Sequence, residues 1–139
     1  MNIERSNRLK FDALTDAVIA ETAWDRARAE NIVRIAAYLA ECAEQERLVT
    51  YGEVATKFGV NKQRSDWINA IYNAIVQPNE LPDITILIVS ASDRKYPSRG
   101  AFNDAGLLRI SGRPKADVPK IQQECFDFQH FDRTFGGSS

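Results

Sequence analysis

The sequence has little of what most metal and nucleophile sites are made from. It contains one histidine, His130, and two cysteines, Cys42 and Cys125, among 139 residues. The two cysteines stand far apart in sequence, and with a single histidine they make no zinc-binding pattern. A disulfide is not expected in a reducing compartment, and free cysteines are among the most buried residue types. We therefore expect both cysteines to be small core residues, and we expect no metal and no cofactor.

Long apolar runs are also missing. No stretch approaches the roughly 18 consecutive apolar residues that a membrane span needs. The first residues, MNIERSNRLKFD, are charged and lack the apolar core of a signal peptide. Hydrophobic and charged residues make up 44% and 27% of the chain, ordinary values for a globular domain. The expectation is a cytoplasmic protein that does not contact a membrane.

The sequence shows no recognisable catalytic motif. It has no nucleophile elbow, Walker loop, HExxH or paired-cysteine motif, and its carboxylates are too scattered to define a metal-dependent nuclease site. His130 lies among aromatic residues, a setting more typical of a packed histidine than of a catalytic base. Asp93 and Asp104 flank a polar loop, which would form a site only if the fold brought them together with His130. We predict that the protein is not an enzyme.

The chain has little net charge of either sign, but its charged residues are unevenly distributed. The net charge is −1, yet residues 57–115 carry nine Lys/Arg against five Asp/Glu, an excess of four positive charges. Residues 1–56 carry seven against ten, and residues 116–139 carry two against four. A local basic patch can bind phosphates even when the whole molecule is nearly neutral. The middle of the chain is therefore the candidate region for an anionic partner.

The first third of the chain, residues 7–46, has the apolar spacing of helices. One stripe with three- and four-residue spacing comprises Ile32, Ile35, Ala36, Leu39, Cys42 and Ala43. An earlier stripe comprises Phe11, Leu14, Ala17 and Val18. The pattern leaves open whether this region is one bent helix or two helices that meet near residues 22–25.

A helix-turn-helix pattern follows in TYGEVATKFGVNKQRSDWINAIYNAI, residues 50–75. Thr50 and Glu53 have the spacing of a capping box, in which each satisfies a free N–H of the helix start. Gly59 stands where a left-handed residue would end the helix. Either Ser65 or Asn61 could cap the second helix, whose apolar positions are Ile68, Ile71, Tyr72 and Ile75.

The remaining segments complete a winged-helix order. Residues 83–90, DITILIVS, form a β-branched apolar run that predicts a buried strand. A basic loop and a possible returning strand follow, and residues 119–135 have the spacing of a closing helix. The expected fold is α+β and mostly α: N-terminal helices, a winged-helix-like helix-turn-helix with a small β-hairpin, and a C-terminal helix. We expect one domain over residues 1–135, with helices in 1–46, the winged-helix-like part in 47–135 and a flexible tail in 136–139.

Residues 48–102 carry a family resemblance. The stretches LVTYGEVATKFG and QPNELPDITILIVSASDRKYPSRGAF resemble the DNA-binding domain of alkylguanine-DNA alkyltransferases and alkyltransferase-like proteins. In that family a Tyr-Gly pair, here Tyr51 and Gly52, opens the first helix of a helix-turn-helix. An arginine near the position of Arg64 replaces a flipped-out base. The resemblance implies a winged helix that binds DNA.

The residues that carry out the family's chemistry are absent from this chain. The reactive cysteine and the histidine that follow the family's proline are Asp83 and Ile84 here. Thr85 stands where the alkyltransferase-like branch keeps an arginine. Alkyl transfer needs an activated thiolate, so this chain has no alkyl acceptor at that place.

These observations predict a non-catalytic bacterial protein that binds DNA as a regulatory or accessory factor, mainly through phosphates. Its expected DNA-binding residues are Tyr51, Lys62, Gln63, Arg64, Ser65, Asn69, Arg94, Lys95 and Arg99. Arg113 belongs to the same basic set, and Asp66 is an unwelcome negative charge at the start of the second helix. Cationic side chains contact phosphates, whereas Gln63 and Asn69 suit adenine edges in the major groove.

A protein–protein module is the alternative. Fold alone does not decide function, and winged helices also bind proteins. The N-terminal helices could contact a protein partner or a second copy of the chain, through anchors such as Phe11, Trp24 or Tyr38. On this alternative the protein is an adaptor, or an interaction module of the toxin–antitoxin or phage-defence type.

Overall fold

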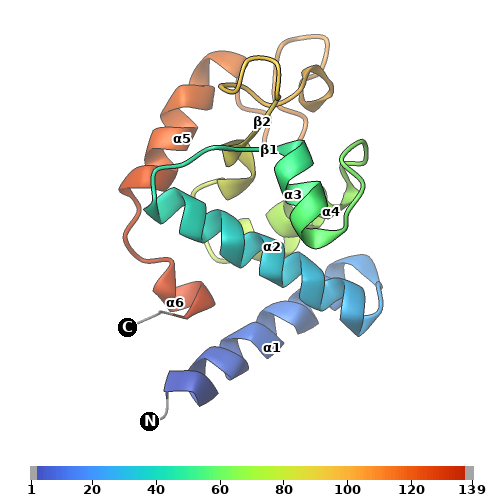
Figure 1. Ribbon diagram of the computed structural model, residues 1–139, viewed down its shortest axis with the longest axis vertical. Coiled ribbons are helices and arrows are strands. Elements are labelled where there is room, and N and C mark those ends of the chain that lie inside the picture. Colours follow the sequence, from blue (N-terminus) through green and yellow to red (C-terminus); the bar gives the residue numbers. More distant parts are fainter. Residues whose placement is uncertain (1–2, 137–139) are drawn as a thin grey trace.

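The computed structural model describes residues 3–136, with side chains from residue 5 onward. Two helices, α1 (Ile3–Thr22) and α2 (Arg26–Glu44), pack against each other at the start of the chain (Figure 1). Ala23 adopts a left-handed backbone (φ 60°) between them, and the Asp25 carboxylate caps α2 by accepting the Arg28 N–H at 2.8 Å. The helical N-terminal segment is therefore two helices, separated at residues 23–25.

The helix-turn-helix has the local geometry that its sequence predicts. Strand β1 (Val49–Thr50) leads into α3 (Tyr51–Phe58), whose capping box between Thr50 and Glu53 is complete. Gly59 ends α3 in the left-handed conformation, with φ 70°. Helix α4 (Asp66–Ile71) continues as a π-helical turn, η1 (Tyr72–Val76). Ser65 occupies the N-cap position of α4 without a side-chain cap, while Asn61 stabilises the turn by accepting the Gln63 N–H.

Replacing Thr50 by alanine is expected to destabilise the protein by about 1 kcal/mol, because the Glu53 N–H loses its side-chain acceptor. Chemical denaturation measures this change. Thr50→Ser keeps the hydroxyl and serves as the control. Equal losses for the two substitutions would contradict the capping role and would point to the packing of the Thr50 methyl group.

Residues 83–90 do not form the expected long strand. They form a 3₁₀ turn, η2 (Ile84–Leu87), and then a two-residue strand, β2 (Ile88–Val89). The Asp83 carboxylate accepts the Thr85 N–H and starts the turn, and the buried Gln122 amide donates to the Ile86 carbonyl. These side chains satisfy backbone groups that a longer strand would have to pair with a neighbouring strand.

The small sheet differs from the expected hairpin. Strand β2 pairs with β1 in parallel, with Val49 opposite Ile88 and Thr50 opposite Val89. In the described part of the chain, the region expected to hold the wing has only isolated antiparallel bridges, Phe102 with Leu108 and Leu107 with Pro114. Short 3₁₀ turns, η3 (Arg99–Ala101) and η4 (Lys115–Asp117), take up the rest of this segment. The fold remains α+β and mostly α.

The closing helix is in two parts, α5 (Val118–Asp127) and α6 (Asp132–Phe135). The extended backbone of Phe128 separates them (ψ 130°), and Phe131 then turns into the core. Helix α6 packs against α1, so the two ends of the described chain lie near each other (Figure 1). Gly136 is the last described residue, and the rest of the expected tail, 137–139, lies outside the described residues.

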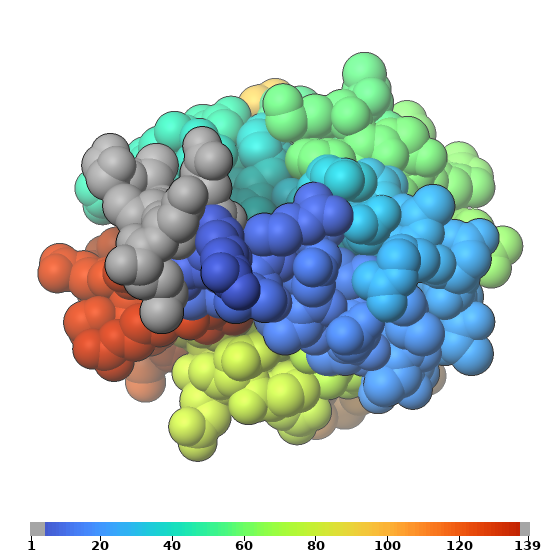
Figure 2. Space-filling view, turned by 90° about the horizontal axis from the view of Figure 1, so that it is seen from below, coloured from blue at the N-terminus to red at the C-terminus, as the bar shows by residue number. Residues whose placement is uncertain are grey.

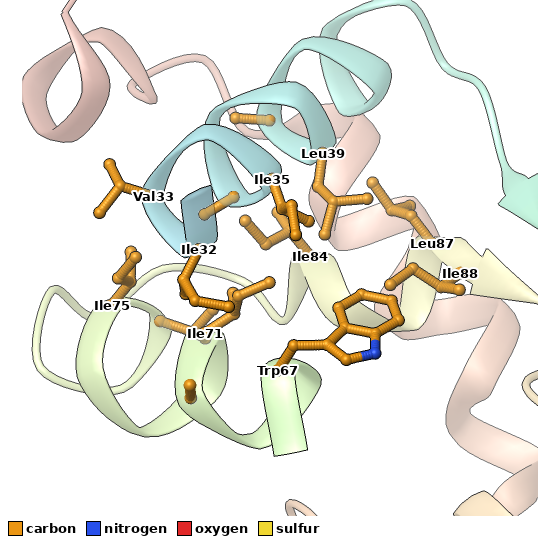
Figure 3. Close-up of a cluster of buried hydrophobic side chains, with 14 of the residues drawn as sticks. Ile32, Val33, Ile35, Leu39, Trp67, Ile71, Ile75, Ile84, Leu87 and Ile88 are labelled. Carbon is orange, nitrogen blue, oxygen red and sulfur yellow. The ribbon is translucent and has the colours of Figure 1, made fainter. Parts of the chain in front are cut away.

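The core is centred on α2. Its Ile32, Ile35 and Leu39 face apolar side chains of α4, η1, η2 and β2 (Figure 3). The partners shown there include Trp67, Ile71, Ile75, Ile84, Leu87 and Ile88. Both cysteines are free and buried, as the sequence predicts. Within residues 3–136, no helix combines the length and the apolar character that crossing a bilayer requires.

Candidate nucleic-acid interface

A hollow of about 250 Å³ lies where the helix-turn-helix corner meets the segment 97–110. In Figure 1 both regions are at the upper right, as the light green turn after α3 and the golden loops. Six of the nine predicted DNA-binding residues line it: Tyr51, Lys62, Gln63, Arg64, Ser65 and Asn69. The lining residues also include Ser98, Gly100 and Arg109. The fold thus gathers most of the predicted site around one concave surface.

The hollow has a polar rim and an apolar floor. Lys62, Arg64 and Arg109 are exposed, so they lie at its rim. Leu108 and Ile86 are almost completely buried and form its floor. The lining includes three cations and no carboxylate, which favours an anionic group at the opening.

Tyr51 joins the two sides of the hollow. Its position at the start of α3 follows from the capping box, which fixes the direction in which the helix leaves β1. The Ser98 N–H donates to the phenolic oxygen at 3.1 Å. Since that oxygen acts as the acceptor, the phenolic hydrogen is available to donate to a phosphate oxygen.

Asp66 is less repulsive to phosphate than its sequence position suggests. Its Oδ2 lies 3.0 Å from Nη2 of Arg28 and 3.4 Å from Nε of Arg64. Its other oxygen accepts the Trp67 N–H at 2.9 Å. Two guanidinium groups therefore offset this carboxylate, and the pairing holds Arg64 near the rim of the hollow.

The remaining three predicted residues lie outside the lining of the hollow. Arg94 forms an ion pair with Glu53, 3.3 Å apart, which ties the basic loop to the capping box. The Lys95 N–H donates to Asp93, and its carbonyl accepts from the Gln122 amide. Arg99 begins η3 and is exposed. These cations extend the positive surface beyond the hollow.

Sequence reasoning missed Arg109 and misread Arg113. Arg109 follows no apolar periodicity and stands alone in the segment between Leu108 and Ile110. Its Nε donates to the Gly100 carbonyl at 3.2 Å, which orients the guanidinium at the rim. Arg113 is instead paired with Glu124 at 2.9 Å and with Asp117 at 3.5 Å. That pairing fastens the segment 107–114 to α5, so Arg113 is a structural residue.

The cations at the rim and on the neighbouring loop differ in whether they already form ion pairs with acidic residues. None of the described acidic residues forms an ion pair with Lys62, Arg99 or Arg109. Arg64 is paired but 68% exposed, so water screens its contact with Asp66. An incoming phosphate would therefore compete with few internal contacts.

A buried carboxyl lies next to the floor of the hollow. The Asp83 Oδ1 accepts both the N–H and the hydroxyl of Thr85, a floor residue. The residue as a whole is half-buried, yet its Oδ2 is shielded from solvent and has no hydrogen-bond partner within residues 3–136. This burial raises the pKa of Asp83 to about 6, against the smaller opposing effect of the Thr85 hydrogen bonds. The apolar run around Asp83 is the only signal in the sequence that could have indicated its burial.

The candidate catalytic residues are not brought together as a metal or acid–base cluster. Asp93 accepts the N–H groups of Lys95 and Tyr96, which lowers its pKa. Exposed His130 packs edge-on to Phe128, with ring centroids 5.8 Å apart. Asp104 is exposed in a turn. Throughout the described chain, no group of three His, Cys, Asp or Glu side chains could hold a metal ion.

Comparison of the chain with models of known protein families, with curated proteins and with solved structures gave no match. The resemblance to the alkyltransferase domain therefore stays a prediction.

Proposed function

We propose that this protein is a non-catalytic DNA-binding factor, regulatory or accessory, that contacts duplex DNA mainly through its phosphates. The observation that carries the proposal is the grouping of Lys62, Arg64 and Tyr51 at one helix-turn-helix corner, around an opening without carboxylates. Phosphate contacts of this kind position a protein on DNA and supply most of its non-specific affinity.

The other predicted residues fit around this corner. Arg94, Lys95 and Arg99 supply further cations on the neighbouring loop, where they can contact a more distant phosphate. Gln63, Ser65 and Asn69 line the hollow and are exposed, so their polar groups are available to base edges. In this proposal the fold is alkyltransferase-like, with the bridged segment 102–114 in the place of the wing hairpin. The short parallel sheet holds the start of α3 against β2.

The state of the cysteines supports a role without alkyl transfer. Cys125 is buried, and burial raises the pKa of its thiol, as it does for Cys42. The Cys125 thiol donates to the Asp83 carbonyl at 3.3 Å. Activated cysteines have lowered pKa values and accessible sulfur, which is the opposite arrangement.

Replacing Arg64 and Arg99 together by alanine is expected to weaken duplex binding roughly tenfold or more at low salt. The slope of log affinity against log salt, which is negative, should become shallower by about 2, because each lost phosphate contact removes about one released counterion. Fluorescence anisotropy with a labelled duplex across a salt series measures both quantities.

The matched control is Lys120→Ala with Arg133→Ala. These two exposed cations lie on α5 and α6, so the change removes the same charge outside the hollow and its neighbouring loop. The control should bind almost as well as the wild type. Absence of wild-type binding at low salt, or equal losses in both double variants, would overturn the proposal.

The interaction-module alternative finds less support in the described surface. The predicted anchors are engaged internally: Arg28 lies 3.4 Å from the Trp24 ring centroid, and the Tyr38 ring packs on Phe58 at 5.4 Å. Helix α1 occupies much of the face in Figure 2, but Leu9 is the one strongly exposed large apolar residue in the described part. A homodimer or partner contact through α1 would therefore have few apolar anchors. A stable complex isolated from the native host, without DNA affinity, would favour this alternative.

A further inference from the structure

The size of the hollow is suited to a bound group that enters it, and not only to a DNA backbone that lies across its rim. Its volume of about 250 Å³ is just below the roughly 300–1,000 Å³ of typical small-molecule sites. It would hold about eight waters at their liquid volume. A continuous duplex backbone can lie across the rim of such an opening, whereas a terminal or free group can enter it.

The charges of the hollow match a doubly charged group. Lys62, Arg64 and Arg109 line it from two parts of the chain, the helix-turn-helix corner and the segment 97–110. A phosphomonoester carries about −1.5 to −2 charges at neutral pH, against −1 for a phosphate within a DNA strand. The Arg109 guanidinium is held by the Gly100 carbonyl through Nε, which leaves its terminal amino groups for an anion.

The floor matches a planar apolar group. Ile86 and Leu108 are buried there, and half-buried Ile68 and Ile110 complete the apolar lining. The amides of Gln63 and Asn69 stand at the opening and provide both donors and acceptors for the edge of a base. Cations, amides and an apolar floor in one small hollow are the groups that a nucleotide needs.

We propose that this hollow binds one nucleotide through a terminal phosphomonoester, with Arg109 as a principal phosphate ligand. The nucleotide is either the 5′-phosphorylated end of a DNA strand or a free mononucleotide. The inference rests on the proposed function, because it assigns the ligand of the same surface. Duplex phosphates occupy the rim and the flanking loop, while the terminal nucleotide occupies the hollow.

Three DNA probes of one sequence test the proposal: a closed dumbbell without ends, a linear duplex with 5′-hydroxyl ends and the same duplex with 5′-phosphates. The 5′-phosphate should raise affinity by about fivefold or more over the 5′-hydroxyl. Arg109→Gln should reduce this ratio to about one. Arg99→Gln, outside the hollow, should weaken the binding of all three probes but keep the affinity ratio between the 5′-phosphate and 5′-hydroxyl duplexes.

Deoxyadenosine 5′-monophosphate and deoxyadenosine, followed by NMR or calorimetry, distinguish the two sources of the nucleotide. Binding of the monophosphate but not of the nucleoside, with no effect of DNA 5′-phosphates, supports the hollow with a free nucleotide as its ligand. A 5′-phosphate effect assigns the DNA end. Dumbbell binding with neither effect overturns this inference alone. Failure of every DNA probe at low salt overturns the proposed function, whatever the mononucleotide does.

Discussion

Replacing Asp83 by asparagine is expected to remove a pH-dependent stability change of up to about 3 kcal/mol between pH 4 and pH 7. In the wild-type protein, burial raises the pKa of Asp83 to about 6, whereas an unfolded aspartate titrates near 4. The charged carboxylate is disfavoured in the fold because its Oδ2 is buried without a partner within residues 3–136. The neighbouring groups do not compensate for the burial of this charge. Tyr72 brings no positive charge, and the attraction of Arg113 has the smallest effect on the pKa of Asp83.

The direction of this pH dependence follows from how tightly the folded and unfolded states bind the Asp83 proton. Between the two pKa values the folded protein holds the Asp83 proton more tightly than the unfolded chain does. The contribution of Asp83 to stability is therefore full below about pH 4 and is lost as the pH rises through 6. Asparagine does not titrate, so the difference in unfolding free energy, variant minus wild type, should increase from pH 4 to pH 7. Urea denaturation at a series of pH values measures this difference.

Asp93→Asn provides a control whose pH dependence has the opposite sign and lies below about pH 4, so its difference from the wild type should stay nearly constant over pH 4–7. The Lys95 and Tyr96 N–H groups stabilise the Asp93 carboxylate and lower its pKa. The contribution of Asp93 is therefore present at neutral pH and is lost as the pH falls through its lowered pKa. A constant difference between Asp83→Asn and the wild type across pH 4–7 would show that the buried carboxyl does not titrate in this range.

Replacing Trp67 by alanine should destabilise the protein by about 3–5 kcal/mol, a large part of the 5–15 kcal/mol typical of a domain. Trp67 is 2% exposed and lies among Leu87, Ile88 and α2 side chains (Figure 3). The substitution leaves a cavity and also removes the hydrogen bond from the indole Nε1 to the Asn61 carbonyl, 3.1 Å long. Thermal and chemical denaturation measure the loss.

Trp67→Phe separates the two contributions. Phenylalanine keeps most of the ring volume but cannot donate to Asn61, so a smaller loss of about 1–2 kcal/mol is expected. Because Asn61 also accepts the Gln63 N–H, this variant should increase amide hydrogen exchange in the turn 60–65 more than in α2. A loss as large as that of alanine would mean that the hydrogen bond, rather than packing, dominates at this position.

Predictions from the sequence succeeded where neighbouring residues decide the structure. Thr50 with Glu53, and Gly59 eight residues after the start of α3, define that helix through hydrogen bonds and a backbone angle that need no distant partner. The apolar stripe from Ile32 to Ala43 likewise follows from helical spacing. The helix-turn-helix corner could therefore be located along the chain in advance.

The prediction failed for residues 83–90, where β-branched residues predicted a strand. Intrinsic preference was overridden there by contacts with α5, since Gln122 is 36 residues from the Ile86 carbonyl to which it donates. The Cys125 thiol donates to the Asp83 carbonyl over a separation of 42 residues. The closing helix was interrupted at Phe128 because Phe131 turns back into the core.

By itself, the sequence determined the capping box and the glycine end of α3, the apolar stripe of α2 and a basic region near the middle of the chain. Those features depend on spacing along the backbone and on composition. Only the tertiary structure decided which cations meet. It placed Arg109 in the lining of the same hollow as Lys62 and Arg64, and it paired Arg113 with Glu124. It also buried the Asp83 carboxylate, because burial and ion pairing depend on segments that the fold brings together from distant positions.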